Sequence, residues 1–392
     1  DGDALQQAVQ EIVRRHEVLR TTFASVDGTA VQVIAPALAL SMPRSDLAAL
    51  PSAQRALALR ALAGQEALHG FDLATGPLLR VHLVRMAANE HVLLLTVHHI
   101  VSDGWSTGVL LHELGVLYRA FVQGQTSPLP ELALQYADFA HWQRQWLSGD
   151  VLQAQLDYWS ARMAGSAAML NLPTDHPRPA LQQHHGALHR FSIDAASTAG
   201  LQALAQQQGA TLFMVMTAVF NILLSRYAGQ DDICIGTPVA NRNEAATEPL
   251  IGFFVNTLVL RTRIDPHARF DTLLAQVRNA LLDDFAHQDL PFEKLVDLLN
   301  PVRQTGSSPL FQVMLSLQNT PAQGIDLPGI TLQGLEGEHV NAKFDLTLNL
   351  VEAGGELAAA WEYDTALFAP ATVARMARHL TSLISSIVRR PD

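Results

Sequence analysis

The sequence lacks several features that would point to other classes of protein. Its 392 residues include one cysteine, Cys234, so an internal disulfide and a cysteine-based metal cluster are both excluded. Lys and Arg number 26 against 37 Asp and Glu, and a net charge of −11 lacks the basic footprint of nucleic-acid binding. The longest apolar runs, such as Val92–Val97, fall far short of the roughly 20 residues that span a bilayer. We therefore expect a cytoplasmic protein that binds neither nucleic acid nor membrane.

The remaining composition is that of a folded protein with more than one compact part. Apolar residues make up 48% and charged residues 16%, which excludes disorder, and the length suggests two or three units. Helical and strand patterns alternate in both halves, and the prolines between 173 and 179 interrupt them. We predict an α/β protein of two α+β two-layer sandwiches, over residues 1–170 and 187–392, joined by a linker over 171–186.

The sharpest local feature is the motif His98-His99-Ile-Val-Ser-Asp103-Gly104, between an apolar strand and a helix. Adjacent strand side chains point to opposite faces, so we expect one histidine to face a cleft and the other to hold the backbone. Asp103 returns beside the strand end, and Gly104 is expected to permit that turn. A neutral imidazole is suited to accept a proton from an attacking amine or hydroxyl.

Taken alone, the histidine pair has competing interpretations. An isolated pair at a strand end is more often structural than catalytic. A metal site is not expected, because adjacent histidines diverge and His112-Glu113 lacks the second histidine of a zinc-protease helix. No G-x-S-x-G motif supports a serine nucleophile, and Cys234 lies in an apolar strand where an inert thiol is the default.

Other segments of the chain change this balance. The motif, extended to Ser106 as HHIVSDGWS, resembles the HHxxxDG signature of nonribosomal peptide synthetase condensation domains. Blocks similar to those of the family follow in the same order across the chain: RHEVLRTTF at 15–23, YADFA at 136–140, IGFFVNT at 251–257, HQDLPF at 287–292 and PLFQV at 309–313. The resemblance implies a V-shaped pseudo-dimer of two chloramphenicol-acetyltransferase-like lobes with a central tunnel.

The resemblance also implies an activity, that of an acyltransferase that forms amide bonds. The amine of an acceptor aminoacyl thioester attacks a donor acyl or peptidyl thioester, and both are carried on 4'-phosphopantetheine arms of carrier proteins. No cofactor bound by the domain itself is expected. The implied partners are donor and acceptor carrier proteins, or an acyl-CoA donor, and a neighbouring adenylation domain, with the domain acting as a monomer within a megasynthase.

The resemblance assigns roles to particular residues. His99 is the reacting imidazole, with His98, Asp103 and Gly104 completing the catalytic motif. Asp103 is expected to be structural and to pair with Arg242 from the other lobe, or with Arg226 as the alternative. Gly104 would leave space for the pantetheine arm, and Trp105, Ser106 and Asn256 are candidate tunnel residues, although core packing is an equal interpretation of Trp105 and Asn256.

Several alternatives remain open at this stage. Within condensation domains, joining two L-residues is favoured, a starter type with a fatty acyl donor is close behind, and a D-configured donor is a third option. An epimerization domain is a further alternative within the family, and a non-catalytic recruitment module of the same fold and a coenzyme A-dependent acyltransferase are the alternatives of other classes. The family's usual Gln-Arg-Leu-Trp block is absent before the first helix, so we expect a fragment of a longer synthetase.

Overall fold

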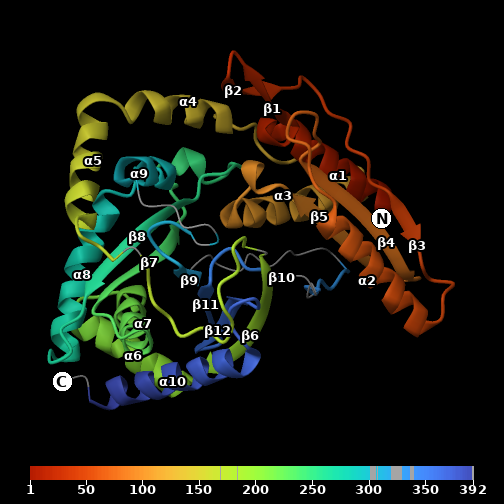
Figure 1. Cartoon of the computed structure of the whole chain (residues 1–392). Helices are drawn as coiled ribbons and strands as arrows, with labels where there is room; N and C mark the ends of the chain where they lie inside the picture. Colours follow the sequence, from red (N-terminus) through yellow and green to blue (C-terminus); the bar gives the residue numbers. More distant parts are fainter. Residues whose placement is uncertain are drawn as a thin grey trace. The chain divides into compact units, whose positions relative to one another are not determined.

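The computed structural model describes residues 1–390 except 168, 183, 301–305, 307, 319–328 and 336–339. Contacts divide these residues into two compact units (Figure 1). The first consists of residues 1–146 and 242–255, with 329–335, and the second of the described parts of 147–241, 256–319 and 340–392. Residues 391 and 392, where the expected second lobe ends, lie outside the described residues.

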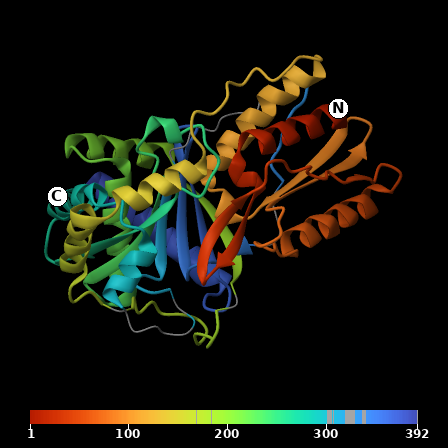
Figure 2. The same cartoon turned by 90° about the horizontal axis from the view of Figure 1, so that it is seen from above.

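The first unit is a three-stranded sheet, in the order β3-β4-β5, with helices packed on it and a separate β1-β2 hairpin. α1 and α3 lie side by side (Figure 2), and the core between them and the sheet contains Ile12, Leu79, Val81 and Leu114. Its elements are α1 (Gly2–Arg15), β1 (Thr21–Val26), β2 (Thr29–Ile34), β3 (Arg44–Asp46), α2 (Ser52–Leu68), β4 (Leu79–Ala87), β5 (Glu90–Val97), α3 (Gly104–Val122) and α4 (Tyr136–Trp146).

The second unit is built on a seven-stranded mixed sheet in the order β10-β6-β12-β11-β9-β7-β8. Phe220 and Trp361 are fully buried in its core. Its strands are β6 (His185–Ile193), β7 (Asp232–Val239), β8 (Asn256–Arg263), β9 (Val313–Gln318), β10 (Val340–Asn341), β11 (Leu346–Ala353) and β12 (Glu356–Asp364). Its helices are α5 (Gly149–Met163), α6 (Ala195–Gln207), α7 (Leu212–Ala228), α8 (Phe270–Ala286), α9 (Phe292–Leu299) and α10 (Pro370–Arg389). Each unit is therefore mixed α/β, as predicted.

The helices of the described residues are short or polar by the standard of a membrane span. No single helix there is both long and apolar enough to cross a bilayer, and α6 and α7 reach that threshold only as a pair bent by 109°. No group of three or more His, Cys, Asp or Glu side chains in the described part of the chain is arranged to hold a metal ion.

The division into units differs from the one expected between residues 170 and 187. α5 belongs to the second unit because Trp159 and Met163 are buried in that unit's core. The expected linker is also fastened to the second unit: the Asp175 carboxylate accepts hydrogen bonds from the N–H of Ala369 (2.8 Å) and the hydroxyl of Thr372 (2.9 Å). Proline spacing marks where regular structure stops, whereas burial decides which core a segment joins.

Candidate active site

The two histidines of the motif lie just beyond the end of β5, in a turn of 3-10 helix over His99–Val101. His98 caps this turn, because its Nδ1 accepts the N–H of Ile100 at 3.0 Å. The His98 imidazole is half-buried, whereas that of His99 is exposed. His98 holds the backbone as expected, but it does so through the capped turn and not through strand alternation, since β5 has already ended at Val97. That His99 faces a cleft stays a prediction.

The His99 imidazole is held by one hydrogen bond, which fixes its tautomer. Its Nδ1 lies 2.5 Å from the carbonyl oxygen of Ser102. A carbonyl only accepts, so Nδ1 carries the proton and the neutral ring leaves its Nε2 lone pair unprotonated. The ring of Phe253 packs against the imidazole with 5.0 Å between centroids and 80° between planes. The exposed nitrogen of His99 can therefore accept a proton.

His98 has a different environment. Burial, followed by the charge of neighbouring His99, lowers the pKa of His98 below its usual value. Its ring meets the ring of Phe71 nearly at right angles, at 5.7 Å, and the guanidinium of Arg80 stacks on Phe71 at 3.9 Å. His98 is thus a neutral, packed side chain that shapes the turn carrying His99.

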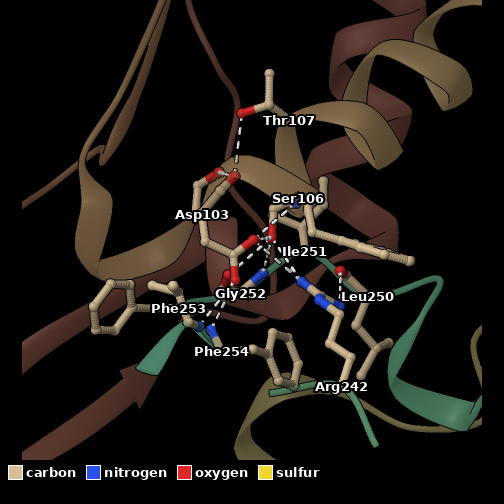
Figure 3. A network of polar contacts seen from close by, with 12 residues as sticks. Asp103, Ser106, Thr107, Arg242, Leu250, Ile251, Gly252, Phe253 and Phe254 are labelled. Atoms are coloured by element: carbon tan, nitrogen blue, oxygen red, sulfur yellow. Dashed lines mark hydrogen bonds and ion pairs between the residues drawn. The ribbon is translucent and has the colours of Figure 1, made fainter. Parts of the chain in front are cut away.

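Asp103 is the centre of a buried polar network (Figure 3). It caps α3 by accepting the N–H of Ser106 at 2.8 Å through Oδ1. Its other oxygen, Oδ2, accepts the N–H groups of Phe254 (2.9 Å) and Val255 (3.2 Å). Because these hydrogen bonds use both oxygens, Asp103 joins the start of α3 to the segment 252–255, and it has no free oxygen to act as a base.

The pairing expected for Asp103 is confirmed: Arg242 Nη2 lies 3.4 Å from its Oδ1, with both side chains 2% exposed. Arg242 also donates to Ser106 Oγ and the Leu250 carbonyl, each at 2.9 Å, and to the carbonyl of Thr247. Burial lowers the pKa of Arg242, and the Asp103 carboxylate partly offsets this.

The expectation that Arg242 comes from the other lobe is wrong as a description of the packing. Residues 242–255 cluster with the first unit, and their contacts with α1 and α3 explain this assignment. Gly252 N–H donates to Ser106 Oγ at 3.0 Å, and Ile251 N–H donates to His16 Nδ1 at 3.3 Å. The alternative partner, Arg226, is exposed on α7 and forms no ion pair within the described residues.

A second buried network secures this segment from the α1 side. His16 Nε2 and the guanidinium of Arg15 both bind Glu113 on α3, at 3.0 Å. Burial alone would raise the pKa of Glu113, but hydrogen bonds from His16 and Arg15 lower it below its usual value. Because His16 also accepts the N–H of Ile251, the network links α1, α3 and the segment 242–255.

The predicted tunnel residues have different environments. Ser106 is fully buried, and its hydroxyl lies 2.7 Å from Asp103 Oδ1, so it belongs to the ion-pair network and not to an open wall. The amide of Asn256 is committed to the backbone of the second unit, since Nδ2 donates to the carbonyls of Gln288 and Leu290 at 2.8 Å. Trp105 is half-buried, with its Nε1 donating to the Glu248 carbonyl at 2.9 Å.

Gly104 is the first residue of α3, and its φ is not in the left-handed region. The expectation that the turn requires a glycine here is therefore wrong. A Cβ placed on Gly104 would meet no atom within 4 Å. The structure itself therefore gives no packing reason for glycine here.

Sequence reasoning missed three groups at this site. The Ser102 carbonyl orients His99, the Phe253 ring packs on it, and the Tyr136 hydroxyl donates to the Phe253 carbonyl at 2.9 Å. Burial, with the nearby Asp103 charge second, raises the pKa of Tyr136 to about 12. Ser102 lies within the motif, and Tyr136 and Phe253 lie within blocks that resemble the family, but none of these positions indicated a contact with His99 or with its neighbours.

Comparisons with known proteins identify one family over the whole chain. The family model described as "Condensation domain" matches residues 1–392. A linear gramicidin synthase of Brevibacillus parabrevis is 49% identical over 395 residues, which cover 100% of this chain and 5% of that protein. Phosphinothricin tripeptide synthetase PhsC of Streptomyces viridochromogenes is 42% identical over 391 residues, covering 99% of this chain and 36% of that protein. The chain thus spans only a small part of these relatives.

Solved structures show the same relationship. The X-domain from teicoplanin biosynthesis superimposes with a TM-score of 0.89 at 28% identity, covering 100% of this chain and 88% of that one. The four-domain nonribosomal peptide synthetase AB3403 gives a TM-score of 0.86 at 25% identity, covering 100% of this chain and 30% of that one. The predicted fold class, α/β units of the chloramphenicol-acetyltransferase type, is confirmed. The chain belongs to the condensation-domain family of nonribosomal peptide synthetases.

Proposed function

We propose that this chain forms an amide bond between two substrates carried as thioesters on the phosphopantetheine arms of carrier proteins. The acceptor amine attacks the donor thioester carbon, so a C–N bond forms and the C–S bond breaks. The proton lost by the amine passes to the departing donor thiolate. Within a synthetase in the cytoplasm, the partners are then a donor carrier, an acceptor carrier and an adenylation domain, and no cofactor is bound by the domain itself.

The observation that carries this proposal is the state of His99. Its imidazole is exposed, and the Ser102 carbonyl keeps Nδ1 protonated, so Nε2 is available to the amine. An α-amino group has an ordinary pKa of about 7.7–8.0, so little base strength is needed. Holding amine and thioester together supplies several kcal/mol more. We assign His99 Nε2 the task of accepting the amine proton and orienting the amine.

The other motif residues support this task. We assign Asp103 a structural role with Arg242, because its oxygens are used by Ser106, Phe254 and Val255. The open space at the Gly104 Cα suits a pantetheine arm, since glycine there has no packing reason of its own. Trp105 remains a candidate wall residue beside this space.

We further propose the elongation type, which joins two L-residues. Relatives at 40–49% identity are named as synthases and synthetases of peptides such as gramicidin and phosphinothricin tripeptide. The starter condensation domain of rhizomide synthetase RzmA is only 20% identical, a level at which the fold alone is shared. The higher identity supports the elongation type over a starter type.

A non-catalytic recruitment module is the second candidate, because the teicoplanin X-domain, similar to this chain at a TM-score of 0.89 and 28% identity, is also known bound to another protein. The teicoplanin X-domain has also been solved as a complex with OxyB. A recruiting surface has no need of an exposed imidazole with a fixed tautomer, so His99 discriminates between the two candidates.

The test uses donor and acceptor carrier proteins loaded with aminoacyl thioesters, with dipeptidyl thioester followed by mass spectrometry. We expect His99→Ala to lose product at least ~100-fold, as removal of a proton-transfer group does. His91→Ala, which removes another exposed histidine from β5, is the matched control and should retain activity. Full product formation by His99→Ala would contradict the assigned role, and no product from the unaltered chain with any donor would favour recruitment.

The subtype needs a separate comparison. Fatty acyl, L-aminoacyl and D-aminoacyl donors are supplied in parallel against one acceptor carrier. We expect the L-aminoacyl donor to react fastest, and a preference for the fatty acyl donor would instead identify a starter domain.

A further inference from the structure

We propose that Phe253 is a positioning residue for His99, through which the buried Asp103 network fixes the orientation of the imidazole. The inference rests on the function proposed above, since it assigns a task to that same histidine. It also gives Asp103 a physical connection to His99 that no direct contact supplies.

The first observation is that the aromatic side chain of Phe253 is partly exposed to water, where it loses part of the stabilisation that burial would give. Its side chain is 37% exposed, whereas adjacent Phe254 is 2% exposed and packs in the interior. Exposing an aromatic ring to water forgoes the hydrophobic gain of burial. Within the described residues the Phe253 ring meets the ring of His99 edge to face, with 5.0 Å between centroids. Core packing therefore does not account for Phe253, whereas contact with His99 does.

The second observation is that the backbone on both sides of Phe253 is fixed. Gly252 N–H donates to Ser106 Oγ at 3.0 Å, and Phe254 N–H donates to Asp103 Oδ2 at 2.9 Å. The carbonyl of Phe253 itself accepts the Tyr136 hydroxyl at 2.9 Å. A side chain on a backbone held at three consecutive residues has a fixed origin, so its ring can act as a fixed surface.

The third observation is that the imidazole needs such a surface. His99 has one hydrogen bond within the described residues, from Nδ1 to the Ser102 carbonyl, and a ring held at one atom can still rock about that bond. The Phe253 ring restricts this motion. An edge-to-face aromatic contact changes a population by about twofold to tenfold. We expect the proton-accepting orientation of His99 to be favoured by that factor.

The experiment measures His99 directly, by NMR of the histidine-labelled chain without substrate. In Phe253→Ala the side-chain resonances of His99 should lose the ring-current shift of Phe253, and the Nδ1-protonated tautomer should become less populated. Phe253→Leu keeps the bulk but not the ring, and should restore the tautomer partly while the ring-current shift stays absent. Trp146→Ala removes an aromatic ring of similar exposure, 38%, from α4 and is the matched control, which should leave His99 unchanged.

Activity gives the second readout. We expect kcat of Phe253→Ala to fall about twofold to tenfold with KM unchanged, because ring orientation matters for the reacting complex. Unchanged amide exchange at Phe254 and Val255 would show that the backbone there is still held. His99 resonances in Phe253→Ala identical to those of the unaltered chain would overturn the inference. An inactive unaltered chain would contradict the proposed function instead, and the NMR result would still stand.

Discussion

The replacement Asp103→Ala tests whether the motif aspartate is a structural anchor. The side chain is 2% exposed and accepts hydrogen bonds from the N–H groups of Ser106, Phe254 and Val255. Alanine removes the acceptor of all three N–H groups, and the one from Ser106 is the helix cap of α3. It also leaves the Arg242 guanidinium without the carboxylate that offsets its burial.

The magnitude follows from these contacts. A buried N–H left without an acceptor costs about 1–3 kcal/mol, which applies to Phe254 and, at its lower end, to the partly buried Val255. Loss of the helix cap adds about 1 kcal/mol. The segment 252–255 can relax toward water, so we take the lower end of each range and expect about 3 kcal/mol of destabilisation in the first unit. This value agrees with the loss of about 3–5 kcal/mol that is typical when one partner of a buried ion pair is removed.

The assay is amide hydrogen exchange read at Phe254 and Val255, together with chemical denaturation. A loss of about 3 kcal/mol corresponds to exchange roughly 150-fold faster where exchange reports the opening equilibrium. His99→Ala is the control, because an exposed imidazole contributes little to stability, and it should leave both amides protected. Unchanged exchange at these two amides in Asp103→Ala would refute the reasoning, whatever happened to activity.

Three further predictions concern other positions. Gly104→Ala should leave thermal stability unchanged, since its Cβ meets no atom, yet slow dipeptide formation if the arm passes there; activity equal to that of the unaltered chain would contradict the space argument. Because the folded pKa of Glu113 lies below the unfolded one, its stabilisation is present above about pH 4.5 and is lost as pH falls through the folded pKa. Denaturation midpoints should therefore differ between the unaltered chain and Glu113→Gln at pH 6 and converge near pH 2. Burial raises the pKa of Cys234 to about 12, so a thiol reagent should label it only after unfolding, which a titration with and without denaturant measures.

Local signals in the sequence predicted much of this protein. The apolar run to Val97 and the periodic leucines after Gly104 predicted β5 and α3, because strands and helices place side chains at fixed intervals. The motif between these elements located His99 and Asp103. The resemblance, together with the rule that a buried carboxylate needs a partner, led to Arg242.

The tertiary structure decided what those residues contact. Asp103 meets Phe254, and His99 meets Phe253, across about 150 residues of chain, and no periodicity relates positions so far apart. The unit boundaries depend in the same way on which core buries Trp159. The sequence alone thus determined the elements and the reactive imidazole. Packing determined its tautomer, its neighbours and the hydrogen bonds that hold them, because these depend on the distances between separate elements.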